Sequence, residues 1–273
     1  MMKKNDYFLD VSGWQVADIS AICAQAGTSK TIIKTTEGTT YFNTSAPIQV
    51  ATSDCQGFYH FSRFGGNITQ AGLEADYFLS TLPKKDVTYL VCDYEDDASY
   101  DKQSNTQAIL HFMRKCKQAG YEPIYYSYKP YTLQYVNYQE IINEFPNSLW
   151  IAAYADYNVR PTPDGIWDIF PSMEGIRWWQ FTSTALPGGL DKNIVLLDDD
   201  VKENKKNKEI KEDLENMNAV IRSKSGKQGY FGISNGKAFG IASIDTVGKL
   251  KQVGFVELTL DDRDYEIIFN RFK

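Results

Sequence analysis

Histidine and cysteine, the side chains that hold most protein zinc, are scarce in this sequence. Its 273 residues include two histidines and four cysteines, and the cysteines are scattered without C-x-x-C spacing. A zinc site usually needs three or four such ligands, several of them closely spaced. We therefore expect no metal site and no cofactor, and we expect Cys23, Cys55, Cys92 and Cys116 to be free thiols buried in the core.

Long apolar runs are also missing. A helix that crosses a bilayer needs roughly 20 apolar residues, and no run in the sequence approaches that length. Residues 1–10 contain two lysines but no apolar segment, so we expect no signal peptide and synthesis in the cytosol. The formal net charge is -6, whereas binding of nucleic acid would favour a dense basic face. The sequence thus favours neither a membrane nor a nucleic acid as a partner.

Aromatic side chains and short apolar runs, by contrast, are abundant, with 18 Tyr, 15 Phe and 5 Trp. Several runs are apolar at nearly every position, as strands buried on both faces are. Helical patterns lie between them at 67–80, 104–120 and 131–145, and Ser104 or Asn105 is the expected cap of the second helix. This alternation over about 200 residues predicts a parallel β/α fold whose size suits a barrel. The expected strands are 7–12, 31–36, 57–62, 88–95, 123–128, 149–154, 176–181 and 193–198.

The composition changes after residue 200, which predicts three parts of the chain. Residues 1–200 carry 15 Lys or Arg and 24 Asp or Glu, residues 201–216 carry five of each class, and residues 217–273 carry nine and six. Mixed charge with few apolar residues is typical of a solvated linker or an exposed helix. We therefore predict a barrel domain over 1–200, a charged linker over 201–216 and a small α+β domain over 217–273. Met217, at the start of the third part, is a candidate internal translation start.

The third part combines a hairpin signal with two helical patterns. Asn235-Gly236 lies between two β-like runs, and this dipeptide is favoured in tight hairpin turns. Residues 255–258 are a candidate third strand, and residues 243–254 and 259–272 read as helices. A domain of this size is only marginally stable alone, so we expect it to form homo-oligomers.

Two carboxylates stand two residues apart where a buried strand is expected to end. Side chains alternate along a strand, so Asp93 and Glu95 should face the same side. Asp10, Glu37 and Asp191 also lie at or near expected strand ends, which meet at the mouth of a β/α barrel. Like charges held close raise at least one pKa and so produce a proton donor near neutral pH. A proton donor beside a second carboxylate is the requirement of glycoside hydrolysis; a solvated acidic loop or a calcium loop is the alternative.

Aromatic and polar side chains near the same strand ends are candidate contacts to a sugar. The apolar faces of sugar rings stack on aromatic rings, although alternation should place about half of these aromatics in the core. Arg63 is a candidate to hold a carboxylate or an N-acetyl carbonyl, or to pair with an acid, and His60 is expected to be a core histidine. The candidate substrate-binding residues are Glu37, Phe61, Arg63, Tyr128, Trp150, Tyr154 and Trp179.

An ordered set of motifs resembles glycoside hydrolase family 25, the Chalaropsis-type lysozymes, over about residues 5–200. The set comprises FLDVS with Asp10, GFYHF, VCDYED with Asp93 and Glu95, LWIAAY, and RWWQF followed by Asp191. The resemblance implies an irregular β/α barrel that hydrolyses the β-1,4 bond between N-acetylmuramic acid and N-acetylglucosamine. It implies that Glu95 is the general acid/base, that Asp93 orients the N-acetyl group or stabilises the charged transition state, and that Asp10 and Asp191 complete the pocket. An enzyme nucleophile and assistance by the N-acetyl group both remain open.

Within this family, the motifs are similar to the catalytic modules of pneumococcal-phage endolysins. The resemblance therefore implies an endolysin that is made in the host cytoplasm and acts on peptidoglycan glycan strands after release. Those proteins continue into aromatic choline-binding repeats, but residues 217–273 contain no Trp. We expect this part to bind another polymer of a Gram-positive wall. A non-catalytic wall-binding module and another sugar-processing barrel, such as a chitinase, are the alternative functions.

Overall fold

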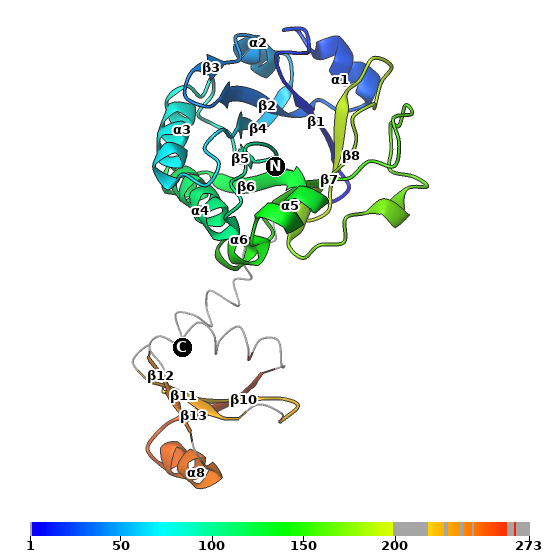
Figure 1. Cartoon of the computed structure of the whole chain (residues 1–273). Coiled ribbons are helices and arrows are strands. Elements are labelled where there is room, and N and C mark those ends of the chain that lie inside the picture. Colours follow the sequence, from blue (N-terminus) through cyan, green and yellow to red (C-terminus); the bar gives the residue numbers. More distant parts are fainter. Residues whose placement is uncertain are drawn as a thin grey trace. The chain divides into compact units, whose positions relative to one another are not determined.

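The computed structural model describes most of the chain (Figure 1). Two compact units, Met1–Asp199 and Asp200–Lys273, make up the chain. The predicted linker 201–216 and the candidate start Met217 lie outside the described residues. Within the described part, no helix is long and apolar enough to cross a membrane. The described residues are 2–198, 218–226, 229–234, 237–241, 243–260 and 265.

Eight strands of the first unit close into a barrel, which confirms the predicted fold class. The order around the ring is β1, β9, β8, β7, β6, β5, β4 and β2; β2 pairs again with β1 and also carries the short strand β3 on its outer end. The strands are β1 Tyr7–Val11, β2 Lys30–Glu37, β3 Tyr41–Phe42, β4 Asp54–Phe61, β5 Tyr89–Asp93, β6 Glu122–Tyr128, β7 Leu149–Ala152, β8 Ile176–Thr182 and β9 Asp191–Val195.

One strand of the ring runs against the others, which the sequence analysis did not predict. β9 is antiparallel to both of its neighbours, β1 and β8, whereas the remaining neighbours around the ring are parallel. A parallel crossover needs a connection of about a dozen residues or more. Only residues 183–190 join β8 to β9, so the chain turns back and β9 begins where β8 ends.

Aromatic side chains fill the inside of the barrel and close one end of it. The rings of Phe8 and Tyr89 meet the Trp178 ring edge-on, with centroids 5.0 and 4.7 Å apart. Trp150 packs above them, 5.4 Å from Phe8 and 5.6 Å from Trp178. Edge-to-face packing at these separations is favourable for aromatic pairs. These rings form an apolar layer, called the aromatic floor below, that closes one end of the barrel. Polar side chains line the other end.

Helices follow the strands from β1 to β6, whereas β7, β8 and β9 are joined by loops and one 3₁₀ turn (Figure 1). Apolar side chains between strands and helices form the larger core, in which all four cysteines are buried and free, as predicted. The helical elements of this unit are α1 Ser20–Ala26, α2 Ala46–Ala51, α3 Ile68–Ser80, α4 Lys102–Gln118, α5 Lys129–Tyr135, α6 Tyr138–Glu144 and the 3₁₀ turn Trp167–Ile169.

The start of α4 differs from the prediction. Its N-cap is Asp101, whose carboxylate accepts a hydrogen bond from the Gln103 N–H (3.0 Å), rather than Ser104 or Asn105. A carboxylate at this position also suits the positive end of the helix dipole. The Asn105 side chain is used elsewhere: its Nδ2 donates to the carbonyls of Ser99 and Tyr135 (2.8 and 3.0 Å).

The single helix predicted over 131–145 is wrong, because it is divided into α5 and α6. Val136, between them, has extended backbone angles, φ −135° and ψ 135°. Side chains of α4 bind the backbone groups that the break exposes. Asn105 donates to the Tyr135 carbonyl (3.0 Å), and the Thr106 Oγ1 accepts from the Asn137 N–H (2.9 Å). Tertiary contacts therefore stabilise a break that the local pattern does not reveal.

His60 is the core histidine that the sequence predicted. It is fully buried on β4, with Nδ1 2.8 Å from the Thr36 hydroxyl and Nε2 2.9 Å from the Glu74 carboxylate on α3. Burial lowers its pKa, against the opposing effect of Glu74. The ring is therefore neutral at pH 7, so Nε2–H donates to Glu74 and Nδ1 accepts from Thr36.

The second unit contains a small sheet with the strand order β12, β11, β10, β13. The strands on either side of Asn235-Gly236, β11 and β12, pair antiparallel and confirm the predicted hairpin. The predicted helix 259–272 is wrong at its start, because Thr259 and Leu260 belong to β13; Tyr265 is helical, and the rest of that segment lies outside the described residues. The elements are β10 Ala219–Ser223, β11 Phe231–Ser234, β12 Lys237–Gly240, α8 Ile244–Gln252 and β13 Val256–Leu260.

Candidate active site

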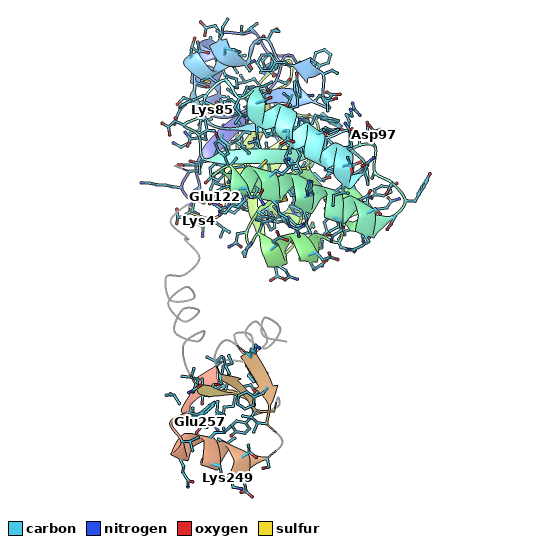
Figure 2. All side chains as sticks on the ribbon, turned by 90° about the vertical axis from the view of Figure 1, so that its left-hand side faces the viewer. Lys4, Lys85, Asp97, Glu122, Lys249 and Glu257 are labelled. Atoms are coloured by element: carbon cyan, nitrogen blue, oxygen red, sulfur yellow. The ribbon has the colours of Figure 1, made fainter. Side chains whose placement is uncertain are left out.

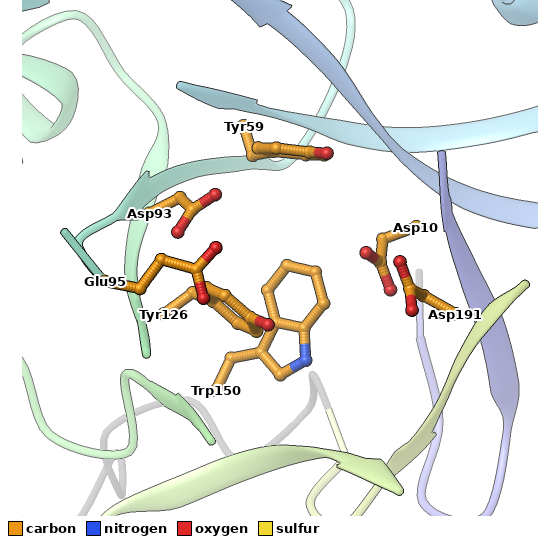
Figure 3. Close-up of a pocket in the computed structure, with 7 residues that line it drawn as sticks. All are labelled: Asp10, Tyr59, Asp93, Glu95, Tyr126, Trp150 and Asp191. Carbon is orange, nitrogen blue, oxygen red and sulfur yellow. The ribbon is translucent and has the colours of Figure 1, made fainter. Parts of the chain in front are cut away.

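Four carboxylic side chains line a pocket at the end of the barrel where the parallel strands end. Asp93 and Glu95 lie on one side of it, and Asp10 and Asp191 face them from the other side (Figure 3). Of the five acids for which the sequence predicted one barrel mouth, the structure brings these four together, whereas Glu37 lies outside the lining. The lining residues are Asp10, Tyr59, Asp93, Glu95, Tyr126, Trp150 and Asp191.

Strand direction explains how acids far apart in the sequence reach the same pocket. Asp10 lies near the end of β1 and Asp93 is the last residue of β5, at the end of the barrel where side chains face the mouth. Asp191 is instead the first residue of β9. It reaches the mouth because β9 is antiparallel, and it lies in register with Asp10.

Glu95 lies two residues beyond β5, yet it faces the same side as Asp93. The backbone N–H of Tyr94 still donates to the Tyr126 carbonyl (3.0 Å), which extends the pairing of β5 with β6. The Tyr94 ring points outward and stacks on Phe64 (centroids 5.4 Å apart). The alternation that the sequence analysis assumed therefore holds past the end of the strand.

Asp10 is a buried acceptor held by two side-chain amides. Gln180 Nε2 and Asn193 Nδ2 donate to its Oδ2 at 2.9 and 2.7 Å. The amides are oriented in turn, since Tyr126 and Tyr154 donate to Gln180 Oε1 and Trp150 Nε1 donates to Asn193 Oδ1. Burial raises the pKa of Asp10 to about 6, and the bonds from Asn193 and Gln180 oppose that rise. The network therefore favours an ionised Asp10 at neutral pH.

Asp191 is the protonated partner of Asp10. Burial, followed by the charges of Asp10 and Glu95, raises the pKa of Asp191 to about 8. A hydrogen bond links the two carboxyl groups, so the neutral Asp191 donates and the ionised Asp10 accepts. At neutral pH the pair therefore shares one proton, and both carboxyl groups lie side by side at the pocket (Figure 3).

Asp93 and Glu95 lie across the pocket from Asp10 and Asp191, and Asp93 is the more deeply buried of the two. Asp93 is buried, and no residue in the described part of the chain pairs with its Oδ1. Burial, followed by the charge of Glu95, raises its pKa well above the ordinary value. A buried oxygen without a partner costs free energy, so a hydrogen bond between Asp93 and a ligand in the pocket would be favourable.

Glu95 is only partly buried and stands at the pocket entrance. Burial, followed by the charge of Asp10, raises its pKa to about 6, whereas Lys34 lowers it. A carboxyl with this pKa exchanges its proton readily near neutral pH. Together with the charged pair opposite, the pocket can donate a proton on one side and stabilise positive charge on the other.

The predicted substrate-binding residues are divided by the structure. Trp150 lines the pocket. Tyr154 is connected to it indirectly, because its hydroxyl donates to Gln180, which in turn donates to Asp10. Tyr128, at the end of β6, is 40% exposed, and the charge of Glu95 adds to the burial that raises its pKa. Tyr128 is not among the residues that line the pocket.

Glu37, Phe61 and Arg63 form a group beside the pocket and are not part of its lining. The Arg63 guanidinium lies over the Phe61 ring, 4.5 Å from its centroid, and bonds to the Glu37 carboxylate at 2.8 Å. Arg63 also pairs with Asp96 and Asp97, so of the two roles predicted for it, the pairing with acids is present in the structure.

The structure does not bring Trp179 to the pocket. Trp178 and Trp179 are consecutive in β8, so they face opposite sides of the barrel wall. Trp178 points inward to the aromatic floor, whereas Trp179 is buried outside, packed on Trp167, Phe170 and Phe181. The sequence shows two adjacent tryptophans but not which of them faces the interior.

Three residues of the site were absent from the sequence prediction, namely Tyr59, Gln180 and Asn193; Tyr126 was one of the aromatics at expected strand ends but not a candidate substrate-binding residue. Alternation in β4 was a usable signal for Tyr59, since a core histidine at position 60 turns its neighbour inward. Gln180 and Asn193 are amides within apolar strands, where an unpaired amide would be costly. That cost was a signal for a buried polar partner, which is Asp10. No group of three or more His, Cys, Asp or Glu side chains suited to a metal ion occurs among the described residues.

This chain is similar in sequence to several known proteins. The family model of glycosyl hydrolases family 25 matches residues 9–190. A lysozyme of Streptococcus phage Cp-1 is 53% identical over 202 residues, covering 73% of this chain and 56% of that protein. A protein of Streptococcus phage B30 named D-alanyl-L-alanine endopeptidase is 58% identical over 199 residues, covering 73% of this chain and 44% of its own length. The chain thus spans about half the length of these relatives.

A solved structure shares both fold and sequence with this chain. The modular Cpl-1 endolysin complexed with a peptidoglycan analogue has a TM-score of 0.66 and 45% identity. The match covers 85% of this chain and 62% of that one.

Proposed function

This chain belongs to the glycosyl hydrolases of family 25, and from that premise we propose that it is a phage endolysin with lysozyme activity. Its substrate is the peptidoglycan glycan strand, in which it hydrolyses the β-1,4 bond between N-acetylmuramic acid and N-acetylglucosamine. The observation that carries the proposal is the pocket in which Glu95 faces the Asp10–Asp191 pair. The names of the relatives, lysozyme and endolysin, support it.

In this mechanism Glu95 is the general acid. Its raised pKa, about 6, keeps a proton on the carboxyl in mildly acid solution, and its partial exposure lets it reach the leaving oxygen of a bound sugar. After the bond breaks, the ionised Glu95 takes a proton from the attacking water. The same group thus serves both steps.

The remaining carboxyls orient the sugar and stabilise its transition state. A protonated Asp93 donates to the carbonyl of the N-acetyl group, which would satisfy the unpaired Oδ1. The single negative charge on the Asp10–Asp191 pair stabilises the positive charge that develops on the ring. Trp150 and Tyr128 offer ring faces for stacking on the sugar.

Substitution of Glu95 tests the proposal. Glu95→Gln should lower the rate of peptidoglycan hydrolysis by about 10²–10⁴-fold, because it removes the proton but keeps the shape. Glu122→Gln is the matched control, since Glu122 begins β6 at the opposite end of the barrel. Analysis of the products separates the alternatives: a new reducing end on muramic acid is expected. A reducing end on glucosamine, cleavage of chitin instead, or binding without products would contradict the assignment.

We infer further that residues 217–273 bind a polymer of the Gram-positive wall and associate with a second copy. The excess of Lys and Arg in this segment favours an anionic polymer, since opposite charge increases the association rate. Ile244, Val253 and Val256 are exposed apolar side chains that a second copy could cover. Synthesis in the host cytoplasm, before release to the wall, completes the proposal.

Two measurements test this inference. Co-sedimentation of the whole chain with purified walls should weaken as salt is raised, because salt screens charge over about 10 Å at 0.1 M. Light scattering should give a mass above that of one chain. Salt-independent sedimentation would reject charge-driven binding, and a monomer would reject self-association.

A further inference from the structure

We propose that Arg63 is the positioning residue for the general acid: it ties the loop that carries Glu95 to strand β2, which lies on the far side of β4 from β5. Glu95 lies just beyond β5, and the next two residues, Asp96 and Asp97, both bind Arg63. This inference rests on the proposed function for the role of Glu95. The contacts of Arg63 themselves do not depend on it.

The Arg63 guanidinium bonds to three carboxylates at once, from two parts of the chain. Nε and Nη2 donate to Glu37 Oε1 at 2.9 and 2.8 Å. Nη1 donates to Asp96 Oδ2 at 2.8 Å and to Asp97 Oδ2 at 2.9 Å. Arginine has five N–H donors, and four of them are occupied by these bonds. Little of the guanidinium is left for a substrate, which favours positioning over substrate binding.

Both ends of this connection are anchored. The Arg63 backbone N–H donates to Glu74 Oε2 (2.9 Å), the carboxylate that also holds His60 behind the barrel wall. The second oxygen of Glu37 accepts from Lys34 Nζ at 2.7 Å. Arg63 is therefore fixed at its backbone, and the carboxylate that it binds on β2 is fixed as well.

A bulge in β2 is what turns Glu37 toward Arg63. Lys34 pairs with Tyr59 and Thr36 pairs with His60, so Thr35 is an extra residue in the strand. A bulge shifts the alternation of side chains by one position. Lys34 and Glu37, three residues apart, therefore lie on the same face and can pair, whereas Thr36 faces outward to His60.

The other side-chain anchors of the loop that carries Glu95 lie beyond Asp97, where the Ala98 N–H donates to the Tyr131 hydroxyl and the Ser99 N–H to Asn105 Oδ1 (both 3.0 Å). No hydrogen bond to the Glu95 side chain occurs in the part of the chain that the structure describes. Asp97 has a positive φ of 60°, a conformation that costs a residue with a side chain about 1–2 kcal/mol. Gly65, two residues after Arg63, approaches so closely that a Cβ there would lie 2.8 Å from the Asp97 carbonyl oxygen. The backbone therefore sets the position of Glu95. Arg63 neutralises the negative charges of Asp96 and Asp97, whose repulsion would otherwise displace this backbone.

Kinetics of Arg63 variants test the proposal. Arg63→Gln should lower kcat about 10–100-fold with little change in KM, since a displacement of about 1 Å at a reacting group can cost 10²-fold in rate. Arg63→Lys should recover only part of kcat, because an ammonium group cannot match the planar fork of a guanidinium. Arg114→Gln is the matched control: Arg114 makes a two-bond pair with Glu144 (2.7 and 2.6 Å) outside the barrel. Its kcat should stay at the wild-type value, with a Tm as in Arg63→Gln.

A rise in KM at unchanged kcat would overturn the proposal, because it would assign Arg63 to substrate binding. The double variant Asp96→Asn, Asp97→Asn provides an independent check. It should lower kcat as Arg63→Gln does, and combining all three changes should add little more. Fully additive losses would also contradict the proposal.

Hydrogen exchange keeps the test separate from the enzymatic assignment. In Arg63→Gln, the amides of residues 95–98 should exchange faster than in the wild type and in Arg114→Gln. This readout needs no substrate, so it holds even if the wild-type products disprove the proposed reaction. Unchanged exchange in this segment would show that Arg63 does not hold the loop.

Discussion

At the scale of single residues, the surroundings of each carboxyl determine its protonation. Asp10 receives two amide donors on one oxygen, whereas Asp93 has a buried oxygen that no described residue pairs with. Asp191 sits beside the charge of Asp10 and retains its proton to about pH 8. Four similar side chains therefore differ in protonation, because acids in unlike environments separate in pKa.

The raised pKa of Asp191 predicts how stability depends on pH. The folded protein holds the proton of Asp191 up to about pH 8, whereas the unfolded chain releases it near the ordinary value of 3.8. This group therefore contributes most to stability below about pH 4, and its contribution is lost as the pH rises toward 8. Asp191→Asn keeps a donor to Asp10 but cannot ionise. The variant should gain stability relative to the wild type as the pH rises, by at least about 1 kcal/mol.

Urea unfolding at about pH 5 and about pH 8.5 measures this difference on either side of the transition. Asp86→Asn, at an exposed position, serves as the control and should show the same difference from the wild type at both values. A constant difference for Asp191→Asn would mean that Asp191 is ionised throughout this range.

At the scale of elements, the bulge in β2 gives two adjacent threonines opposite roles. The Thr36 hydroxyl is bonded to His60 Nδ1 (2.8 Å), whereas the equally buried Thr35 hydroxyl has no partner in the described structure. Thr36→Val should cost about 1–3 kcal/mol of unfolding free energy, because it leaves the histidine nitrogen unsatisfied. Thr35→Val, its matched control, should be neutral or stabilising. Equal losses in urea unfolding would show that the bulge does not separate the two.

The sequence was a good guide to elements whose pattern is local. All eight barrel strands were predicted, because their apolar runs are buried on both faces. The break at Val136 was not, since the groups that stabilise it, Asn105 and Thr106, belong to another helix. β10 was also missed; its short run pairs with β13 more than 30 residues later in the chain.

The candidate site was predictable to a similar extent. Alternation was sufficient to place Asp93 and Glu95 on one side, and the strand ends indicated Asp10 and Asp191. Alternation alone does not determine which of the two sets of side chains along a strand faces the barrel interior. It therefore could not distinguish Trp178 from Trp179, nor reveal that the amides of Gln180 and Asn193 point inward.

At the scale of the whole molecule, the division into two units predicts that hydrolysis of soluble fragments and clearance of intact walls can be separated. A chain ending at Asp199 retains every residue that lines the pocket. Its kcat/KM on short soluble peptidoglycan fragments should be within about 3-fold of the whole chain, whereas its clearance of intact walls at low salt should be slower, because the basic segment is missing. Turbidity of walls and product release from fragments measure the two activities. Equal clearance of walls by both chains would leave residues 217–273 without a role in targeting.

The reversed direction of β9 has a consequence for how such a barrel is joined to other sequences. Asp191 begins β9 at the pocket, so the strand carries the chain to the opposite end of the barrel. There the Lys4 N–H donates to the Asp198 carboxylate at 2.7 Å, and Figure 2 shows Lys4 far from Asp97 at the mouth. The chain therefore enters the barrel near Lys4 and leaves it near Asp198, side by side at the end opposite to the pocket. A segment joined to the barrel unit at either of these positions therefore begins at the end opposite to the opening for the substrate.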